Sequence, residues 1–288
     1  MSEQHPSSSE LTPWDIVQIA RHPQRPRTLN YIRSICEDFV ELRGDRRFGD
    51  DRALIGGVAR FQGRTVVVIG HQKGSNTKEN LQYNFGSPRA EGYRKALRLM
   101  QHAQKFNFPI LTFIDTPGAD PSMASEERGI GEAIAENLLV MAELDVPIVA
   151  TVIGEGGSGG ALAIGVADRL LMLEYAIYSV ASPEASAAIL WRDATQAPEA
   201  AKAMKITARD LRQLGIVDQI VAETPGGAHL DTGATTAAVS AAIQQHLSEL
   251  SRLTKTELRD RRYEKYRSIG VFQQEQPFTL NTAAVPHL

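Results

Sequence analysis

Hydrophobic residues form short continuous runs through the first two thirds of the chain, and stretches with helical spacing of apolar residues separate them. The runs predict strands at residues 53–61, 64–72, 109–115 and 147–153, and a pair of strands over residues 169–180. The stretches between them predict helices at residues 90–106, 125–144 and 158–167. Gln62-Gly63 joins the first two runs as a short hairpin. The later alternation of strand and helix predicts right-handed βαβ units and an α/β fold.

The flanking regions predict mainly helices. Thr12 and Pro13 suit the start of a first helix, and Thr28 suits the start of a second one that reaches Leu42. Residues 73–88 look like a polar loop. Short helices are expected at residues 182–190, 197–204 and 207–215, then a strand at 216–223 and a long helix at 234–250. We predict a disordered tail over 1–9, one main domain over 10–250, and over 251–288 a charged, solvated helical extension with a loose end.

Composition restricts the class of protein. The chain has 288 residues, of which 42% are hydrophobic and 23% charged, with a formal net charge of -3, so we expect no nucleic-acid partner. The single cysteine, Cys36, permits neither a disulfide within the chain nor a cysteine zinc site, and we expect it to be a buried structural thiol. Glu155 and several glycines interrupt the weakly polar run over residues 146–167, so we expect no membrane span, no signal peptide and a cytoplasmic location.

The stretch "VIGEGGSGGALAIG" at residues 152–165 contains three overlapping motifs. Gly154, Gly156 and Gly159 match the dinucleotide fingerprint, and Glu174 lies where a ribose-binding acid is expected. Against NAD binding, at least four expected strands precede the motif, whereas the fingerprint normally opens the first βαβ unit.

The second motif is a nucleophile elbow around Ser158, followed along the chain by Asp218 and His229 in the order of α/β hydrolases. Nothing in the sequence forces either partner near Ser158, so we predict that Ser158 is not a nucleophile. The third interpretation needs only the backbone. Gly159 and Gly160, at the start of an expected helix, can present N–H groups to a developing oxyanion.

Longer motifs then connect these segments to one family. They are "IARHPQRPRTLNYI", "FVELRGDRRFGDDRALIGGVAR", "GHQKG", "NFGSPRAEGYRKALRLM", "TFIDTPGA", "EERG", "VIGEGGSGGALAIG" and "SPEASAAILW". Together they resemble the α subunit of the bacterial-type acetyl-CoA carboxylase carboxyltransferase, from about residue 11 to about residue 250. The resemblance implies a crotonase-like fold of stacked ββα units with flanking helices.

The resemblance also implies the reaction and its partners. Carboxybiotin, presented by a separate biotin carboxyl carrier protein, gives its carboxyl group to acetyl-CoA, and malonyl-CoA forms as the first committed step of fatty acid synthesis. Oxyanions develop on both substrates, so the enzyme mainly has to position and stabilise them. A β subunit, which carries the only zinc, would hold acetyl-CoA, and the assembly is expected to be α2β2. No cofactor is bound covalently to this chain, and no metal.

The implied site lies at two strand ends. Gly159 and Gly160 would form the biotin-side oxyanion hole, with Gly156 given only a turn role. Gly118, Ala119, Gly156 and Gly157 would line the substrate site, and Gly118-Ala119 is the alternative position of the hole. Lys73 and Lys78 would contact carrier phosphates or the β subunit, unless they simply belong to a solvated loop.

Some residues depart from the family pattern beside this site, namely Asp120, Ser122, Ala185 and Ser186. We interpret Asp120 as a solvated turn residue rather than a catalytic acid. His22, His71 and His229 look too scattered to form a metal site. Two other functions stay open: a stand-alone crotonase-type acyl-CoA hydrolase or isomerase, and a non-catalytic α-like subunit.

Overall fold

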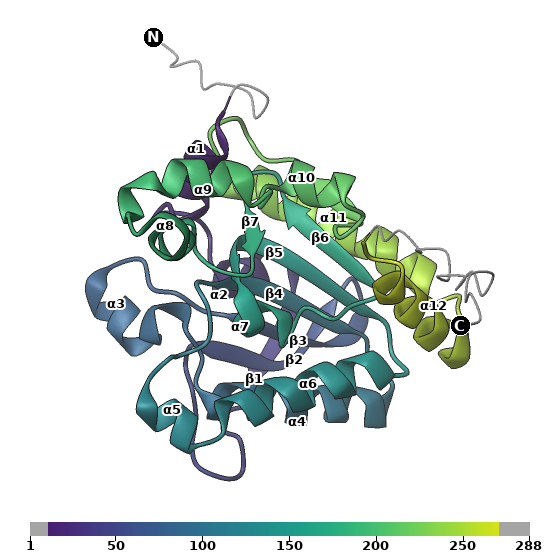
Figure 1. The fold of residues 1–288 in the computed structure, drawn as a ribbon. Coiled ribbons are helices and arrows are strands. Elements are labelled where there is room, and N and C mark those ends of the chain that lie inside the picture. The colour runs from purple at the N-terminus through teal and green to yellow at the C-terminus, as the bar shows by residue number, and fades with distance from the viewer. Residues whose placement is uncertain (1–10, 271–288) are drawn as a thin grey trace, which may run out of the picture.

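One mixed sheet organises the chain, for which the computed structural model describes residues 11–270 (Figure 1). Its strands are β1 (Glu37–Glu41), β2 (Leu54–Phe61), β3 (Arg64–His71), β4 (Ile110–Thr116), β5 (Ile148–Gly157), β6 (Arg169–Leu173), β7 (Ile177–Ser179) and β8 (Gln219–Val221). The order is β1-β2-β3-β4-β5-β6-β8, and β7 pairs with the end of β5. The β1–β2 and β2–β3 pairs are antiparallel, and the remaining pairs are parallel.

Helices cover both faces of this sheet (Figure 1). The α-helices are α1 (Pro13–Ala20), α2 (Thr28–Ile35), α3 (Thr77–Gln82), α4 (Ala90–Phe106), α5 (Met123–Glu127), α6 (Ile130–Glu143), α7 (Ser158–Leu162), α8 (Pro183–Trp191), α9 (Ala197–Ala203), α10 (Ala208–Gln213), α11 (Thr232–Leu250) and α12 (Lys255–Arg267), with 3-10 turns η1 (Asn84–Gly86) and η2 (Ala194–Gln196). The α4 and α6 helices pack together on one side of the sheet, and α2 and α11 on the other. None of the helices in residues 11–270 is long and apolar enough to cross a membrane.

Local sequence signals explain the best-predicted elements. Thr12 accepts a hydrogen bond from Asp15 N–H and Pro13 begins α1, as expected. The β2–β3 hairpin turns at Gln62 and Gly63, with φ of 49° and 73°. Positive φ at both residues fits the twist of a two-residue hairpin. The α4 helix matches its expected bounds, because its apolar residues keep helical spacing along its whole length.

Several element boundaries were predicted wrongly. The second helix stops at Ile35, where the chain enters the edge strand β1 instead of continuing to Leu42. Gly129, with φ of 74°, separates α5 from α6 within the single helix expected over residues 125–144. The expected polar loop contains α3. The strand β5 runs on to Gly157, so that only α7, five residues long, follows it.

The ends of the main domain also differ from expectation. The charged segment after Leu253 forms α12, but Leu258 and Arg262 are buried, so one face of this helix is not solvated. The Arg262 guanidinium donates to Asp168 at 2.9 Å and to the carbonyls of Met141 and Leu144. The tail predicted over residues 1–9 and the loose end within 271–288 lie outside the described residues.

Candidate active site

Two strand-to-helix junctions lie side by side, as the parallel pairing of β4 with β5 requires. Thr116 of β4 is in register with Gly156 of β5. A Cβ atom on Gly157 would lie 2.1 Å from the carbonyl oxygen of Pro117. The two backbones therefore approach so closely that only glycine fits at position 157.

The two glycine-containing turns, at Gly118-Ala119 and at Gly159-Gly160, are in direct contact. A Cβ atom on Gly160 would lie 2.5 Å from the backbone nitrogen of Ala119 and 2.9 Å from the hydroxyl oxygen of Tyr93. Gly160 is buried, and Gly118 beside it has a φ of 148°. The loop at Gly118-Ala119 thus forms one wall behind Gly160, and the two candidate positions for an oxyanion hole belong to one site.

Backbone N–H groups are available at the start of α7. Gly157 is the N-cap, so Ser158, Gly159 and Gly160 are the first three helical residues, and their N–H groups have no acceptor within the helix. Among the described side chains, none caps this end. A Cβ atom on Gly159 would contact nothing closer than Ile134, at 3.8 Å. Gly159 therefore offers a donor beside open space. Because α7 is so short, its dipole adds less than the longer helix we expected.

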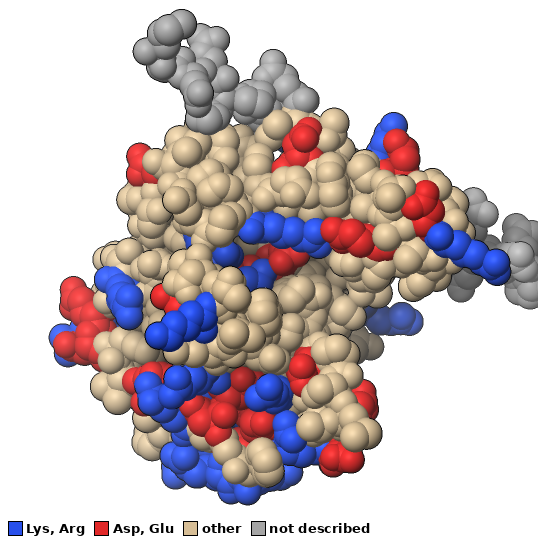
Figure 2. Space-filling view, turned by 90° about the vertical axis from the view of Figure 1, so that its left-hand side faces the viewer, with Lys and Arg blue, Asp and Glu red and all other residues tan. Residues whose placement is uncertain are grey.

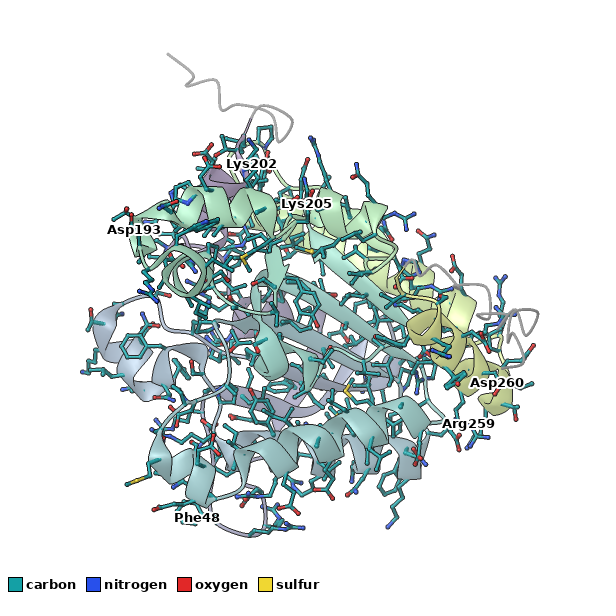
Figure 3. The ribbon with its side chains drawn as sticks, viewed as in Figure 1. Phe48, Asp193, Lys202, Lys205, Arg259 and Asp260 are labelled. Atoms are coloured by element: carbon teal, nitrogen blue, oxygen red, sulfur yellow. The ribbon has the colours of Figure 1, made fainter. Side chains whose placement is uncertain are left out.

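An apolar groove of about 410 Å³ opens beside Gly159. Its lining includes Leu162 of α7, Tyr178 of β7, and Leu214 after α10, and Lys205 adds one basic side chain. Figure 3 places Lys205 near the top of the molecule, beyond the end of α9. A ligand in this groove would have mostly apolar surroundings and would meet Gly159 at one end, whereas Gly160 is buried behind it.

Below the glycine turn, a buried cluster of charged side chains connects the ends of β3, β4 and β5. The Lys73 ammonium lies 2.8 Å from Asp115 Oδ1 and 2.7 Å from Glu155 Oε2. Arg27 reaches the other oxygen of Asp115 at 2.9 Å, and Arg21 reaches the other oxygen of Glu155 at 2.6 Å. We call these five residues the strand-end cluster.

Charge pairing sets the protonation states in the strand-end cluster. Burial alone would raise the pKa of Asp115 and of Glu155, but Lys73 outweighs it, with Arg27 at Asp115 and Arg21 at Glu155, and both pKa values are lowered. Burial would lower the pKa of Lys73, and the two carboxylates raise it instead. All three groups are therefore charged near neutral pH, which is the arrangement that makes buried charges tolerable.

The strand-end cluster fixes the backbone immediately before the glycine turn. Asp115 Oδ1 accepts a hydrogen bond from the Glu155 N–H at 3.1 Å, and a Cβ atom on Gly154 would lie 2.5 Å from the same oxygen. Arg21 also pairs with Glu184 of α8 and so joins this helix to the cluster. Sequence reasoning missed this arrangement, although Glu155 inside an apolar run was a usable signal, because a buried charge requires a partner.

The two lysines proposed from the sequence have different surroundings. Lys73 is buried and its ammonium is engaged by two carboxylates, so it does not present a charge at the surface to a carrier phosphate. Lys78 is exposed on α3. Of the pair, only Lys78 has the accessibility that the proposed contact requires.

Asp120 is not a solvated turn residue. Its carboxylate accepts hydrogen bonds from Ser125 at 2.5 Å, from Asn84 at 3.2 Å and from Ser122. Its side chain is 11% exposed. Burial would raise its pKa, but these donors lower it. Asp120 and Ser122, two of the departures from the family pattern, therefore act together in holding the loop after Ala119. The other two, Ala185 and Ser186, lie in the first turn of α8.

Ser158, Asp218 and His229 do not form the catalytic triad that the hydrolase interpretation requires. Asp218 accepts from the Leu170 N–H at 2.6 Å and pairs with Lys265 of α12. His229 stacks on His22, with ring centroids 3.7 Å apart. Both partners are thus engaged elsewhere, although Ser158 is exposed and has a φ of 51°. The third histidine, His71, is fully buried, and burial lowers its pKa to about 3.

The dinucleotide interpretation also lacks support in the geometry. Gly154 and Gly156 lie within β5 rather than in a turn. A Cβ atom on Gly156 would lie 2.1 Å from Cδ2 of Tyr178, so this glycine makes room for a ring and has more than the turn role expected of it.

Cys36 is half-buried rather than fully buried, and burial raises the pKa of its thiol to about 11.

The chain matches solved structures of a transcarboxylase and of a malonate decarboxylase. Transcarboxylase 12S with methylmalonyl-coenzyme A bound matches with a TM-score of 0.63 at 21% identity, over 85% of this chain and 45% of that one. A Pseudomonas malonate decarboxylase hetero-tetramer with coenzyme A matches with a TM-score of 0.60 at 18% identity, over 71% of this chain and 82% of that one. These matches confirm the crotonase-like α/β fold that we predicted, which is the fold of carboxyltransferases.

Sequence relatives give the family within that class. The family model described as acetyl co-enzyme A carboxylase carboxyltransferase-like matches residues 2–270. The acetyl-coenzyme A carboxylase carboxyl transferase subunit alpha of Synechococcus sp. (strain CC9902) is 60% identical over 268 residues, which are 92% of this chain and 80% of that protein. The subunit of the same name from Nostoc sp. (strain PCC 7120) is 59% identical over 268 residues, which are 92% of this chain and 82% of that protein. The chain belongs to the acetyl-CoA carboxylase carboxyltransferase α-subunit family.

Proposed function

We propose that this chain is the α subunit of an acetyl-CoA carboxylase carboxyltransferase and that its glycine turn stabilises negative charge on the biotin side of the reaction. The reaction moves a carboxyl group from carboxybiotin to acetyl-CoA and gives biotin and malonyl-CoA, in the cytoplasm, for fatty acid synthesis. Membership of the family supports the activity. The N–H groups of Gly159 and Gly160 support the assignment of the site.

The observation that carries the site assignment is that backbone N–H groups without an acceptor in the helix lie next to an open groove. Gly159 and Gly160 follow the N-cap and have no acceptor within α7, and the apolar groove begins at Gly159. Carboxybiotin contributes a ureido group whose oxygen gains negative charge as its carboxyl group leaves. Two N–H groups aimed at that oxygen stabilise it more strongly as the charge develops, which is the requirement for catalysis.

Other parts of the site position the donors and exclude water. The strand-end cluster holds β5 through the hydrogen bond from Glu155 N–H to Asp115, and the Gly118-Ala119 loop closes the rear of Gly160. Apolar side chains of the groove, such as Leu162 and Leu214, are exposed in the free chain; a substrate that covered them would displace water and so strengthen the hydrogen bonds. We infer no proton-transfer role for these residues. Carboxybiotin releases CO2, the biotin ureido anion that remains takes the methyl proton of acetyl-CoA, and the thioester enolate attacks the CO2.

The partner belongs to the proposal. Relatives are named α subunits, and the malonate decarboxylase match is a hetero-tetramer, so we infer a β subunit that binds acetyl-CoA and carries zinc, in an α2β2 assembly. A separate biotin carboxyl carrier protein would deliver carboxybiotin, and Lys78 on α3 is accessible to the carrier or to the β subunit.

Carboxyl transfer measured with and without the β subunit tests this function. We expect malonyl-CoA to form from carboxybiotin and acetyl-CoA only when both chains are present. Acyl-CoA hydrolysis or isomerisation by this chain alone would favour the stand-alone enzyme instead. If an intact α–β complex transferred no carboxyl group, the interpretation as a non-catalytic α-like subunit would be favoured.

A further inference from the structure

A second cavity, of about 700 Å³, shares none of its lining residues with the candidate active site. It lies between α2, the edge strand β1, its neighbour β2, and Tyr83 just before η1. Its apolar side chains include Ile32 and Ile55, which are 1% and 3% exposed, and the half-buried Phe39. Volumes of 300–1,000 Å³ with an apolar floor and a few polar groups are typical of small-molecule sites. The cavity is therefore large enough and well enough built to hold a ligand.

The charged groups around this cavity are mainly basic. Arg33, Arg43 and Arg52 line it, and Glu41 is the one carboxylate among its lining residues. Glu41 pairs with Arg43 at 2.9 Å. Within residues 11–270, the side chains of Arg33 and Arg52 make neither an ion pair nor a hydrogen bond, and both are exposed. Two uncompensated guanidinium groups thus face one cavity in a chain whose formal net charge is -3.

Figure 2 shows the charged side chains on one side of the molecule. Basic side chains gather at the lower end of the molecule, the end at which Figure 3 labels Phe48. Phe48 belongs to the loop between β1 and β2, which also carries Arg43 and Arg52. The same loop also carries Asp45, Asp50 and Asp51, so the uncompensated positive charge at the cavity is that of its own lining arginines.

We propose that the cavity binds a nucleoside diphosphate group, with its phosphates between Arg33 and Arg52 and its base against Phe39, Tyr83 and the apolar floor. The planar guanidinium forks suit phosphate oxygens, and aromatic side chains offer flat surfaces for a base. A free nucleotide and the nucleotide half of coenzyme A share this chemistry. The proposal rests on the cavity alone and does not depend on carboxyl transfer.

Cys36 supplies a direct reporter, because it is the single cysteine of the chain and lines this cavity. Burial raises the pKa of its thiol to about 11, so modification is slow at neutral pH and measurable in mildly alkaline buffer. The experiment follows a neutral maleimide adduct on the full chain by intact mass. ADP, acetyl-CoA or sodium sulfate is added at matched ionic strength. Binding of mant-ADP, followed by fluorescence anisotropy, is the second measurement.

We expect ADP or acetyl-CoA to slow the modification of Cys36 and sodium sulfate to leave it unchanged. The Arg33→Gln/Arg52→Gln variant should weaken mant-ADP binding by about tenfold to a hundredfold, since each lost charged hydrogen bond is worth roughly a tenfold change. Arg47→Gln removes an exposed arginine of the same loop that does not line the cavity, and should bind normally. Stronger protection by acetyl-CoA than by ADP would assign the site to coenzyme A, and the reverse to free nucleotides.

Three results would overturn the proposal. The first is no protection of Cys36 together with no mant-ADP binding at millimolar nucleotide. Equal protection by sodium sulfate would reduce the site to a nonspecific anion effect. Equal binding by the double variant and by Arg47→Gln would show that the two cavity arginines do not recognise the ligand. Circular dichroism of each variant excludes misfolding as the cause of a loss.

Discussion

Removing the charge of Lys73 tests whether the strand-end cluster supports the glycine turn. In Lys73→Met, the carboxylates of Asp115 and Glu155 lose the cation that lies 2.8 Å and 2.7 Å from them. Their side chains are only 1% and 10% exposed, so water replaces the lost partner poorly. Breaking a buried ion pair from one side typically costs about 3–5 kcal/mol. Arg27 and Arg21 stay bound to the far oxygens, so we expect a loss near the lower end of that range.

A second substitution separates charge from packing. Lys73→Met/Glu155→Gln removes one of the two facing carboxylates, and Asp115 keeps its pair with Arg27. The double variant should recover about 2 kcal/mol relative to Lys73→Met, which is within the usual coupling energy of residues in contact. Both variants are compared with the wild type by urea denaturation followed by circular dichroism, with carboxyl transfer measured in the reconstituted complex.

The stability of Lys73→Met should also depend on pH in a predictable direction. In the wild type the pKa values of Asp115 and Glu155 are lowered, so their contribution to stability is present above the unfolded pKa of about 4 and is lost as the pH falls below it. Without Lys73 these pKa values rise, and protonation of one carboxyl group relieves the repulsion. The stability gap between wild type and Lys73→Met should therefore narrow from about pH 8 to about pH 5.5. A gap below about 1 kcal/mol at both pH values would refute this reasoning.

Three further predictions concern residues of the glycine motif. Ser158→Ala should keep carboxyl transfer within a few-fold of wild type, because Asp218 and His229 are engaged elsewhere; a loss of about 10⁴-fold would identify a nucleophile. Gly156→Ala should destabilise the chain by roughly 1–3 kcal/mol in urea denaturation, since its Cβ would lie 2.1 Å from the Tyr178 ring, and an unchanged midpoint would contradict that contact. Titration of the chain with NADH should give no saturable fluorescence change, and micromolar binding would revive the dinucleotide interpretation.

Periodicity predicted most elements of the fold, because their signals are local. The β2–β3 hairpin, α4 and the start of α1 follow from turn residues, apolar spacing and a capping threonine. The errors occur where tertiary contacts decide. The chain after Ile35 pairs with β2 as an edge strand, and pairing with β7 extends β5 to Gly157. Neither interaction leaves a signal in the segment itself.

The candidate site was predicted in part. The two glycine turns were found from their strand-end positions, and the parallel register of β4 and β5 explains why they meet. The strand-end cluster was not foreseen, because Arg21, Lys73 and Glu155 are far apart in sequence and are brought together only by three adjacent strands and the segment between α1 and α2. The sequence also could not predict that Gly159 lies beside open space whereas Gly160 packs against the backbone of Ala119, because this depends on what surrounds each Cα in the fold.

This difference decides how the central claim is tested. Gly160→Val would drive a side chain into the backbone of Ala119, so a loss of activity could follow from damage to the fold. Gly159 has open space around it, and a valine there should leave the fold intact while its side chain stands between the N–H groups and the groove. Gly49→Val is the matched control, because Gly49 also has open space and lies in the β1–β2 loop.

The most direct measurement is carboxyl transfer by the reconstituted α–β complex carrying Gly159→Val, with assembly checked by gel filtration and stability by urea denaturation. The account predicts a loss of about a hundredfold to a thousandfold in kcat, the usual effect of removing one oxyanion donor, with a normal complex and normal activity for Gly49→Val. Near-normal turnover by an intact Gly159→Val complex would contradict the assignment of the oxyanion site to Gly159 and Gly160.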